Sequence, residues 1–213
     1  MTRVSAGARI HVGFQNLSLS HDRLYGGVGF ALDRPRITVE ATPADSVRCA
    51  DTLVAEYATA VCDLLDVSGV DLTVEERLPR HVGLGSGTQI ALATLTAVSE
   101  AYDREPRVRE RAPSLGRGGR SGVGVAAFER GGFVVDAGHP TTRFTTDTPE
   151  DGSWTVPVVV VRHDLPEAWR VLLVYPDADA GRSGETEDAS TRAAVERADP
   201  ALADELGGIL TRR

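Results

Sequence analysis

Two glycine-rich segments have residue types and spacing that could bind negatively charged oxygen atoms. The first, PRHVGLGSGTQ at residues 79–89, lies between a predicted strand and a predicted helix. The N-terminus of a helix presents backbone N–H groups to an anion, and glycine leaves those groups accessible. The segment is neither a Walker A loop nor a dinucleotide fingerprint, and a tight turn before a capped helix is the alternative interpretation. The candidate phosphate-binding residues are Gly83, Leu84, Gly85, Ser86, Gly87, Thr88 and Gln89.

The second segment is GRGGRSGVG at residues 116–124. It follows an Arg-rich stretch, because residues 104–120 contain six Arg and two Glu in a chain of formal net charge −8. Arg can hold a phosphate or a carboxylate through two parallel hydrogen bonds; a solvated, flexible basic loop is the alternative. Two such loops in one chain favour a ligand with several negative charges. The candidates in this segment are Arg117, Arg120 and Ser121.

Catalytic candidates come at the end of an apolar strand predicted over residues 131–136. Side chains in such positions are often functional. Asp136 could bind a metal or take a proton, and His139 could act as an acid or a base. A structural turn at the strand end explains both residues equally well. His11 and Asn16 follow an early β-like stretch and are polar enough to line a pocket, but the sequence does not separate binding from solvation there.

Apolar periodicity predicts the elements that position these residues. Strands are expected at residues 35–41, 70–78, 131–136, 156–161 and 171–175, the last two in the interior of a sheet. Helices are expected at 53–65 with Asp51 as the cap, at 88–102 as a buried helix, at 122–129 closed by Gly131, and from Asp199-Pro200 onward. This mixture, without strict βαβα alternation, predicts an α+β fold. The polar segment 145–155 predicts a first domain over residues 1–155 and the incomplete beginning of a second over 156–213.

The composition argues against several classes of protein. The net charge of −8 disfavours non-specific binding to nucleic acid or anionic membranes. No apolar run approaches a membrane span and the N-terminus lacks an apolar signal core, so we expect a cytoplasmic protein with neither nucleic-acid nor membrane partners. Cys49 and Cys62 have no metal-like spacing. All 23 basic residues are Arg, so Arg must stand wherever a related protein uses Lys.

The order of these motifs resembles the GHMP kinase superfamily, whose central motif is a proline and a Gly-Leu-Gly-Ser-Ser loop that opens a buried helix. The motif here spans Pro79 to Gly87, with Gly87 at the second serine. Arg9 stands at the lysine of the superfamily's early Pro-Gly-Lys-type segment, and it joins His11 and Asn16 as a candidate substrate-binding residue. Within the superfamily, the chain is similar to the beta-ribofuranosylaminobenzene 5'-phosphate synthases at residues 24–29, 81–89, 116–124 and 132–139.

The resemblance implies a ribosomal S5 domain 2-like domain, followed in full-length relatives by a ferredoxin-like domain. It implies a transferase that joins the sugar phosphate of phosphoribosyl pyrophosphate to a 4-substituted benzoate, with loss of carbon dioxide and pyrophosphate. The product would serve a methanopterin or folate-type cofactor. Such chemistry implies Mg²⁺, clamps for phosphate and a cation for the aromatic acid. No metal ligand is assigned, and a homodimer stays open.

One departure from the kinase pattern weakens a rival interpretation. Mevalonate-type kinases carry Ser-Gly-x-Asp, whereas residues 121–124 read Ser-Gly-Val-Gly, so Gly124 replaces the acid. A general base typically contributes about 10²–10⁴ in rate, and Arg9 cannot replace it because a guanidinium stays protonated. An ATP-dependent small-molecule kinase is therefore the weaker alternative. A non-catalytic relative that still binds phosphate ligands is the third.

Overall fold

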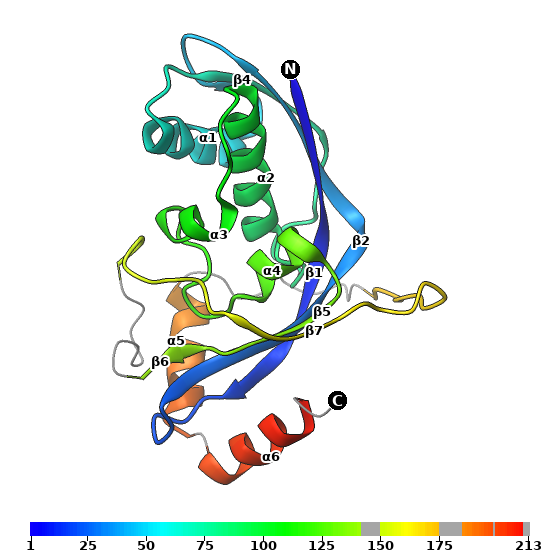
Figure 1. Ribbon diagram of the computed structural model, residues 1–213, viewed down its shortest axis with the longest axis vertical. Helices are drawn as coiled ribbons and strands as arrows, with labels where there is room; N and C mark the ends of the chain where they lie inside the picture. The colour runs from blue at the N-terminus through cyan, green and yellow to red at the C-terminus, as the bar shows by residue number, and fades with distance from the viewer. Residues whose placement is uncertain (142–149, 175–184, 198, 211–213) are drawn as a thin grey trace.

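The computed structural model describes residues 1–141, 150–174, 185–197 and 199–210, which form an α+β fold around one mixed sheet (Figure 1). The sheet runs in the order β3-β4-β2-β5-β7, and β1 and β6 also pair with β2. The strands are β1 (Thr2–Asn16), β2 (Arg23–Pro43), β3 (Arg48–Cys49), β4 (Val70–Glu76), β5 (Phe133–Asp136), β6 (His139–Pro140) and β7 (Val159–His163). The helices are α1 (Thr52–Leu65), α2 (Ser86–Ala101), α3 (Val108–Arg111), the 3-10 helix η1 (Pro113–Leu115), α4 (Val123–Arg130), α5 (Glu185–Val195) and α6 (Pro200–Leu210). The predicted fold class is confirmed.

A long antiparallel hairpin of β1 and β2 is the frame of the molecule. Its pairing runs from Thr2 opposite Ala41 to Asn16 opposite Tyr25. The register shifts twice in β1, between Gly7 and Arg9 and again between His11 and Gly13. A bulge adds a residue to one strand and turns the neighbouring side chains. Both shifts fall beside side chains that the sequence marks as binding candidates.

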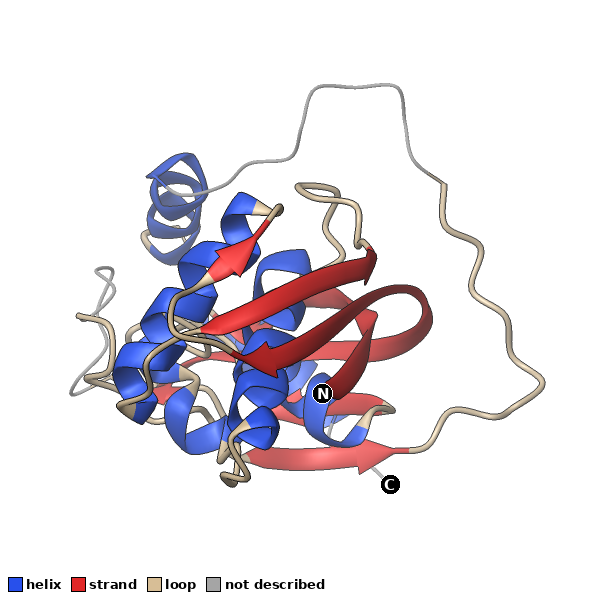
Figure 2. Ribbon diagram, turned by 90° about the horizontal axis from the view of Figure 1, so that it is seen from above, coloured by secondary structure: helices blue, strands red, loops and turns tan. Residues whose placement is uncertain are grey.

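The helices gather mainly on one side of this frame, as Figure 2 shows. In Figure 1, α1 and α2 lie together on the concave side of the curved hairpin. Helix α2 is buried along most of its length because β1, β2, α1 and α4 all pack against it. The predicted buried helix is thus confirmed, with its start at Ser86. Asp51 caps α1 as predicted, since its carboxylate accepts from the amides of Leu53 and Val54.

The remaining local predictions divide clearly. The strands predicted at 35–41 and 70–78 are parts of β2 and β4, and the helix predicted at 122–129 is α4, with Gly131 at its C-cap. The helix predicted at Asp199-Pro200 is α6, and the Asp199 carboxylate accepts from the amide of Ala201 at 3.0 Å. Among the described residues, no helix has both the length and the apolar character that a membrane crossing requires.

Two predictions of interior strands are wrong. Residues 156–161 contribute only the start of β7, an edge strand in which Val160 is 55% exposed. Residues 171–174 form no strand and Leu172 is 87% exposed, while Tyr175 lies outside the described residues. An apolar run has the same composition whether or not another element covers it. Because β7 pairs with β5, the sheet continues past residue 155, and the division into two domains stays a prediction.

Candidate functional site

The first glycine-rich segment forms the N-terminus of α2. Gly85 is the N-cap residue in a left-handed conformation (φ +69°), and as a glycine it makes no side-chain cap hydrogen bond. Its carbonyl oxygen accepts from the amides of Thr88 and Gln89, both at 3.1 Å. The first N–H groups of a helix have no intrahelical acceptor. The positive end of the helix dipole therefore lies at a glycine-rich turn.

Arg9 lies directly against this turn. The backbone N–H of Arg9 donates to the carbonyl of Leu84 at 3.0 Å, and its guanidinium donates to the carbonyl of Gly83 at 3.2 Å. A β-carbon at Gly85 would come within 2.7 Å of Arg9 Nε. Glycine is favoured at this position by the left-handed backbone and by the close approach of the Arg9 side chain. The structure thus places the predicted substrate-binding Arg9 at the predicted phosphate-binding loop.

Arg117, from the second glycine-rich segment, approaches the same helix end. Its Nη1 lies 3.3 Å from the point that a β-carbon at Gly87 would occupy. Its guanidinium carbon lies 5.3 Å from the centre of the Tyr57 ring, and its Nη2 donates to the Tyr57 hydroxyl. Two guanidinium groups, those of Arg9 and Arg117, therefore flank the first turn of α2. We call this arrangement the anion nest.

The second segment, residues 116–124, is held in place by contacts from later in the chain. The carbonyl of Gly118 accepts from Nε2 of His139 at 3.0 Å, so this nitrogen carries the hydrogen. The indole N–H of Trp154 donates to the carbonyl of Arg117 at 3.0 Å. His139 and Trp154 are both almost fully buried. These anchors fix the backbone from which Arg117 reaches the nest.

Arg120 and His11 are associated with a row of aromatic rings. Burial raises the pKa of Tyr25, and the nearby charge of Arg120 opposes that shift. The rings of His11 and Phe14 are 4.7 Å apart, and the row continues through Tyr25 to His139. Burial, reinforced by the charge of Arg9, lowers the pKa of His11 to about 4. Arg120 thus acts on Tyr25, whereas Arg117 approaches α2.

The buried carboxylate of Asp136 accepts hydrogen bonds from three separate segments that contain glycine. One carboxylate oxygen accepts from the Ser121 hydroxyl at 2.9 Å and from the amide of Gly122 at 2.7 Å. The other accepts from the amide of Gly138 at 2.8 Å, and the amide of Gly27 adds a further hydrogen bond. Complete burial raises the pKa of Asp136, and these donors oppose the shift. Its oxygens and the Ser121 hydroxyl serve the architecture of the site, and their predicted chemical roles stay predictions.

The side chains next to Gly124, the position of the kinase acid, also have packing roles. The three atoms nearest to a β-carbon at Gly124 all belong to Thr88, the closest at 3.0 Å. The buried amide of Gln89 donates to the carbonyl of Gly124 at 2.9 Å. The side chains of Thr88 and Gln89 therefore tie α2 to α4. No carboxylate stands among those nearest atoms.

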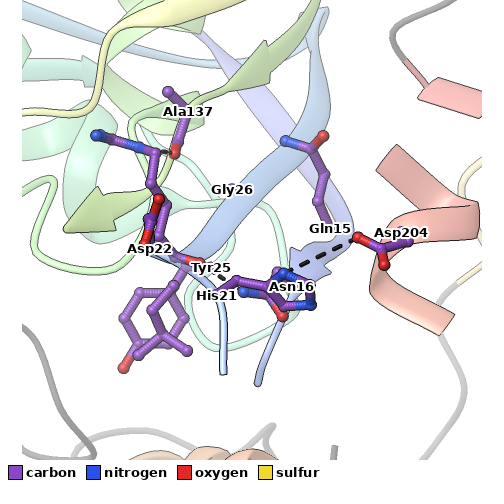
Figure 3. A pocket seen from close by; sticks show the side chains of 10 residues that line it. Gln15, Asn16, His21, Asp22, Tyr25, Gly26, Ala137 and Asp204 are labelled. Carbon is purple, nitrogen blue, oxygen red and sulfur yellow. Dashed lines mark hydrogen bonds and ion pairs between the residues drawn. The ribbon is translucent and has the colours of Figure 1, made fainter. Parts of the chain in front are cut away.

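Asn16 lies apart, at the turn of the hairpin. Its amide nitrogen donates to the carbonyls of Ser18 and Arg23, and its oxygen accepts from the amide of Ser18. It lines a cavity of about 300 Å³ between the hairpin and α6, which Figure 3 shows. His21 and Asp204 both line this cavity, and Nδ1 of His21 lies 3.9 Å from Oδ1 of Asp204. The described geometry does not bring Asn16 to the anion nest.

The structure therefore gathers some of the predicted site residues and separates others. The nest unites Arg9, the backbone of Gly83 to Gly87, and Arg117. Tyr57, which contacts Arg117, is the residue that the sequence interpretation missed. Its helical spacing among apolar residues predicts a position in the core. Its polar tip was the only signal of another role, since a buried tyrosine hydroxyl usually has a hydrogen-bond partner.

The described side chains do not fit a metal ion held by the protein alone. Asp136, the metal candidate, gives its oxygens to internal donors. In the part of the chain that the structure describes, no three His, Cys, Asp or Glu side chains come close enough together to hold an ion. Mg²⁺ is usually bound by one or two carboxylates together with substrate phosphates. Mg²⁺ stays a prediction, and no chemical step below is routed through it.

Comparison with known proteins gives this geometry a context. Residues 47–132 match the GHMP kinases N terminal domain. The chain is 36% identical over 199 residues to the beta-ribofuranosylphenol 5'-phosphate synthase of Methanothermobacter thermautotrophicus, which covers 86% of the chain and 60% of that protein. It is 38% identical over 182 residues to the enzyme of the same name from Archaeoglobus fulgidus, covering 83% of the chain and 58% of that protein. Among solved structures, the mevalonate kinase of Methanococcus jannaschii is 15% identical, with a TM-score of 0.48 over 63% of the chain and 52% of the kinase.

These comparisons support the expected fold, but they cover only part of the length of the related synthases. The matched domain and the α+β architecture agree with the expected ribosomal S5 domain 2-like fold. The chain spans about 60% of the length of the synthases that it matches. What those whole proteins do is therefore carried to this chain only as a proposal.

Proposed function

We propose that this chain is a member of the GHMP kinase superfamily that transfers a ribose phosphate from phosphoribosyl pyrophosphate to the ring of a 4-substituted benzoate. The names of its relatives, which refer to a ribofuranosylphenol phosphate, favour 4-hydroxybenzoate as the acceptor. The products would be a ribofuranosylphenol 5'-phosphate, carbon dioxide and pyrophosphate. A place in the synthesis of a methanopterin or folate-type cofactor is part of the same proposal.

The observation that carries the proposal is the pair of guanidinium groups at the start of α2. Arg9 lies against Gly85, and Arg117 lies near Gly87, two residues further along. A pyrophosphate group has oxygens on two phosphorus atoms, so two separate cations suit it better than they suit a single carboxylate. The helix N-terminus adds backbone donors between the two cations. The nest would hold the leaving group of phosphoribosyl pyrophosphate.

The proposed reaction balances without an oxidant or a further reactant. A ring carbon of 4-hydroxybenzoate, the one that bears the carboxylate, forms a bond to C1 of the ribose. The bond between C1 and the pyrophosphate oxygen breaks, and its electron pair leaves with pyrophosphate. The carboxylate then departs as carbon dioxide, and its bonding electrons restore the aromatic ring. Donors fixed around pyrophosphate stabilise the charge that develops as the C1–O bond breaks.

Two alternatives use the same nest differently. A small-molecule kinase would place ATP phosphates there, but the atoms nearest to Gly124 belong to Thr88, so that position supplies no acid. A non-catalytic relative would bind the phosphate ligand without turnover. Both alternatives predict anion binding, so binding alone does not separate them from the synthase.

The test follows carbon dioxide and pyrophosphate together. The protein is incubated with phosphoribosyl pyrophosphate and carboxyl-labelled 4-hydroxybenzoate, with and without Mg²⁺. We expect labelled carbon dioxide and pyrophosphate in equal amounts, and none with ATP in place of the sugar donor. Thermal unfolding gives the binding readout, since a ligand at a hundred times its Kd stabilises a fold by about 2.7 kcal/mol.

Matched variants connect the activity to the nest. Arg117→Ala should abolish carbon dioxide release, whereas Arg34→Ala, at a side chain that is 81% exposed, should leave it unchanged. Stabilisation by phosphoribosyl pyrophosphate without carbon dioxide release would replace the synthase with the non-catalytic alternative. ADP formation from ATP with a small alcohol would replace it with the kinase.

A further inference from the structure

Tyr57 lies in the middle of α1 and contacts the guanidinium of Arg117 in two ways. The ring lies 5.3 Å from the guanidinium carbon, and the hydroxyl accepts from Nη2. Burial raises the pKa of Tyr57, and its two arginine neighbours, Arg117 and Arg80, oppose the shift. The hydroxyl therefore stays protonated at neutral pH and serves as a neutral acceptor. One side chain supplies both a cation–π surface and a hydrogen-bond acceptor to the same guanidinium.

The positions of Nη1 and Nε of Arg117 indicate what the contact with Tyr57 does. With Nη2 held by Tyr57, Nη1 is left 3.3 Å from the β-carbon position of Gly87. Nε is buried and has no hydrogen-bond partner among the residues that the structure describes. A buried donor without an acceptor costs about 1–3 kcal/mol. Tyr57 thus keeps Arg117 against α2 although the contacts made there leave one donor unsatisfied.

We propose that Tyr57 is a positioning residue that holds Arg117 for the second phosphate of a diphosphate group, while Arg9 serves the first. The inference rests on the proposed function, because it assigns the diphosphate to the anion nest. An arginine side chain has four rotatable bonds, and fixing them before binding removes an entropy cost from binding. Tyr57 therefore makes the nest selective for pyrophosphate over a single phosphate.

Two variants separate the contributions of the ring and the hydroxyl. Tyr57→Phe removes only the acceptor, and we expect the affinity for inorganic pyrophosphate to fall about 2- to 10-fold, the range for one hydrogen bond. Tyr57→Leu also removes the aromatic face, and we expect a fall of about 10- to 100-fold. Affinity for inorganic phosphate, which needs only one cation, should change less than about threefold. Titration calorimetry with both anions gives the ratio of the two affinities.

Tyr102→Phe is the matched control. The Tyr102 hydroxyl is likewise hydrogen-bonded inside the protein, in this case as a donor to the carbonyl of Gly69, at the opposite end of α2. This variant should lose comparable stability and keep both affinities. If the role of Tyr57 is purely structural, Tyr57→Phe and Tyr57→Leu should lower thermal stability. The ratio of the affinities for pyrophosphate and phosphate should then stay unchanged. Should Tyr57→Leu not fold, Tyr57→Phe and its control still decide the question.

The outcomes distinguish this inference from the proposed function. If the unaltered protein binds pyrophosphate and the Tyr57 variants keep its affinity ratio, the positioning role is wrong and the synthase proposal stands. If the unaltered protein does not bind pyrophosphate, both proposals are wrong. A lowered ratio in both Tyr57 variants, with the Tyr102 variant unchanged, supports the positioning role.

Discussion

Replacing Gly85 by alanine tests the geometry of the anion nest most directly. The residue has φ +69°, and a β-carbon there would lie 2.7 Å from Arg9 Nε and 2.8 Å from its Cζ. Left-handed backbone costs an L-residue about 1–2 kcal/mol. Arg9 is a flexible side chain and can swing away, so we expect the loss of stability to stay near that value. The displaced guanidinium, however, no longer reaches the nest.

The expected effects differ in size between stability and binding. For a chain of this length, 1–2 kcal/mol lowers Tm by about 2–8 °C. A hydrogen bond from a charged group contributes about 1.5–3 kcal/mol, so the affinity for pyrophosphate should fall about 10- to 100-fold. Calorimetric unfolding and isothermal titration of the same samples measure the two effects. Arg9→Ala should reproduce the loss of affinity without the backbone strain.

Gly152→Ala is the control for backbone strain. Gly152 also has a positive φ (+82°), but among the described residues its β-carbon would meet only Ser114, at 3.9 Å. This variant should lose similar stability and keep full affinity. Our account of the nest is refuted if Gly85→Ala and Arg9→Ala both bind pyrophosphate as tightly as the unaltered protein.

Two further predictions concern stability. Burial lowers the pKa of His139 to about 4, so between pH 6.5 and 4 the unfolded chain binds a proton that the folded protein does not. The contribution of His139 to the unfolding free energy should therefore fall by up to about 3 kcal/mol as the pH falls through this window. Because the pKa of His11 is lowered in the same way, His139→Gln should reduce the slope in urea titrations without abolishing it. A β-carbon at Gly27 would lie 1.9 Å from Ser121 Oγ, so Gly27→Ala should cost about 3 kcal/mol or more. In the described part of the chain, a β-carbon at Gly13 meets no atom within 4 Å, so Gly13→Ala should change stability by less than about 0.5 kcal/mol; equal unfolding curves for the two variants would contradict this account.

The sequence predicted well the features that depend on local chemistry. Asp51 was identifiable as a cap because a carboxylate before an apolar period is a local signal. The loop at residues 83–87 was identifiable as a helix start because glycine and hydroxyl residues precede a long apolar segment. In both cases the neighbours that decide the structure lie within a few residues along the chain.

The features that depend on distant neighbours were beyond the sequence. Nothing along the chain shows that Ser121 and Asp136 are hydrogen-bonded, or that Tyr57 meets an arginine sixty positions later. The exposure of Leu172 was equally hidden, because it depends on what packs over the apolar run. The sequence could therefore name donors and carboxylates, but the three-dimensional structure was needed to show which of them face each other.

The hydrogen bonds around Asp136 have a consequence for how quickly the protein can engage its ligand. One carboxylate locks the turns at residues 121–122 and 138 while β5 folds into the sheet. The turns at residues 121–122 and 138 are thus already joined in the protein without a ligand, and we expect them to keep this arrangement when an anion binds. Association should then follow simple one-step kinetics, as expected when binding requires no conformational change.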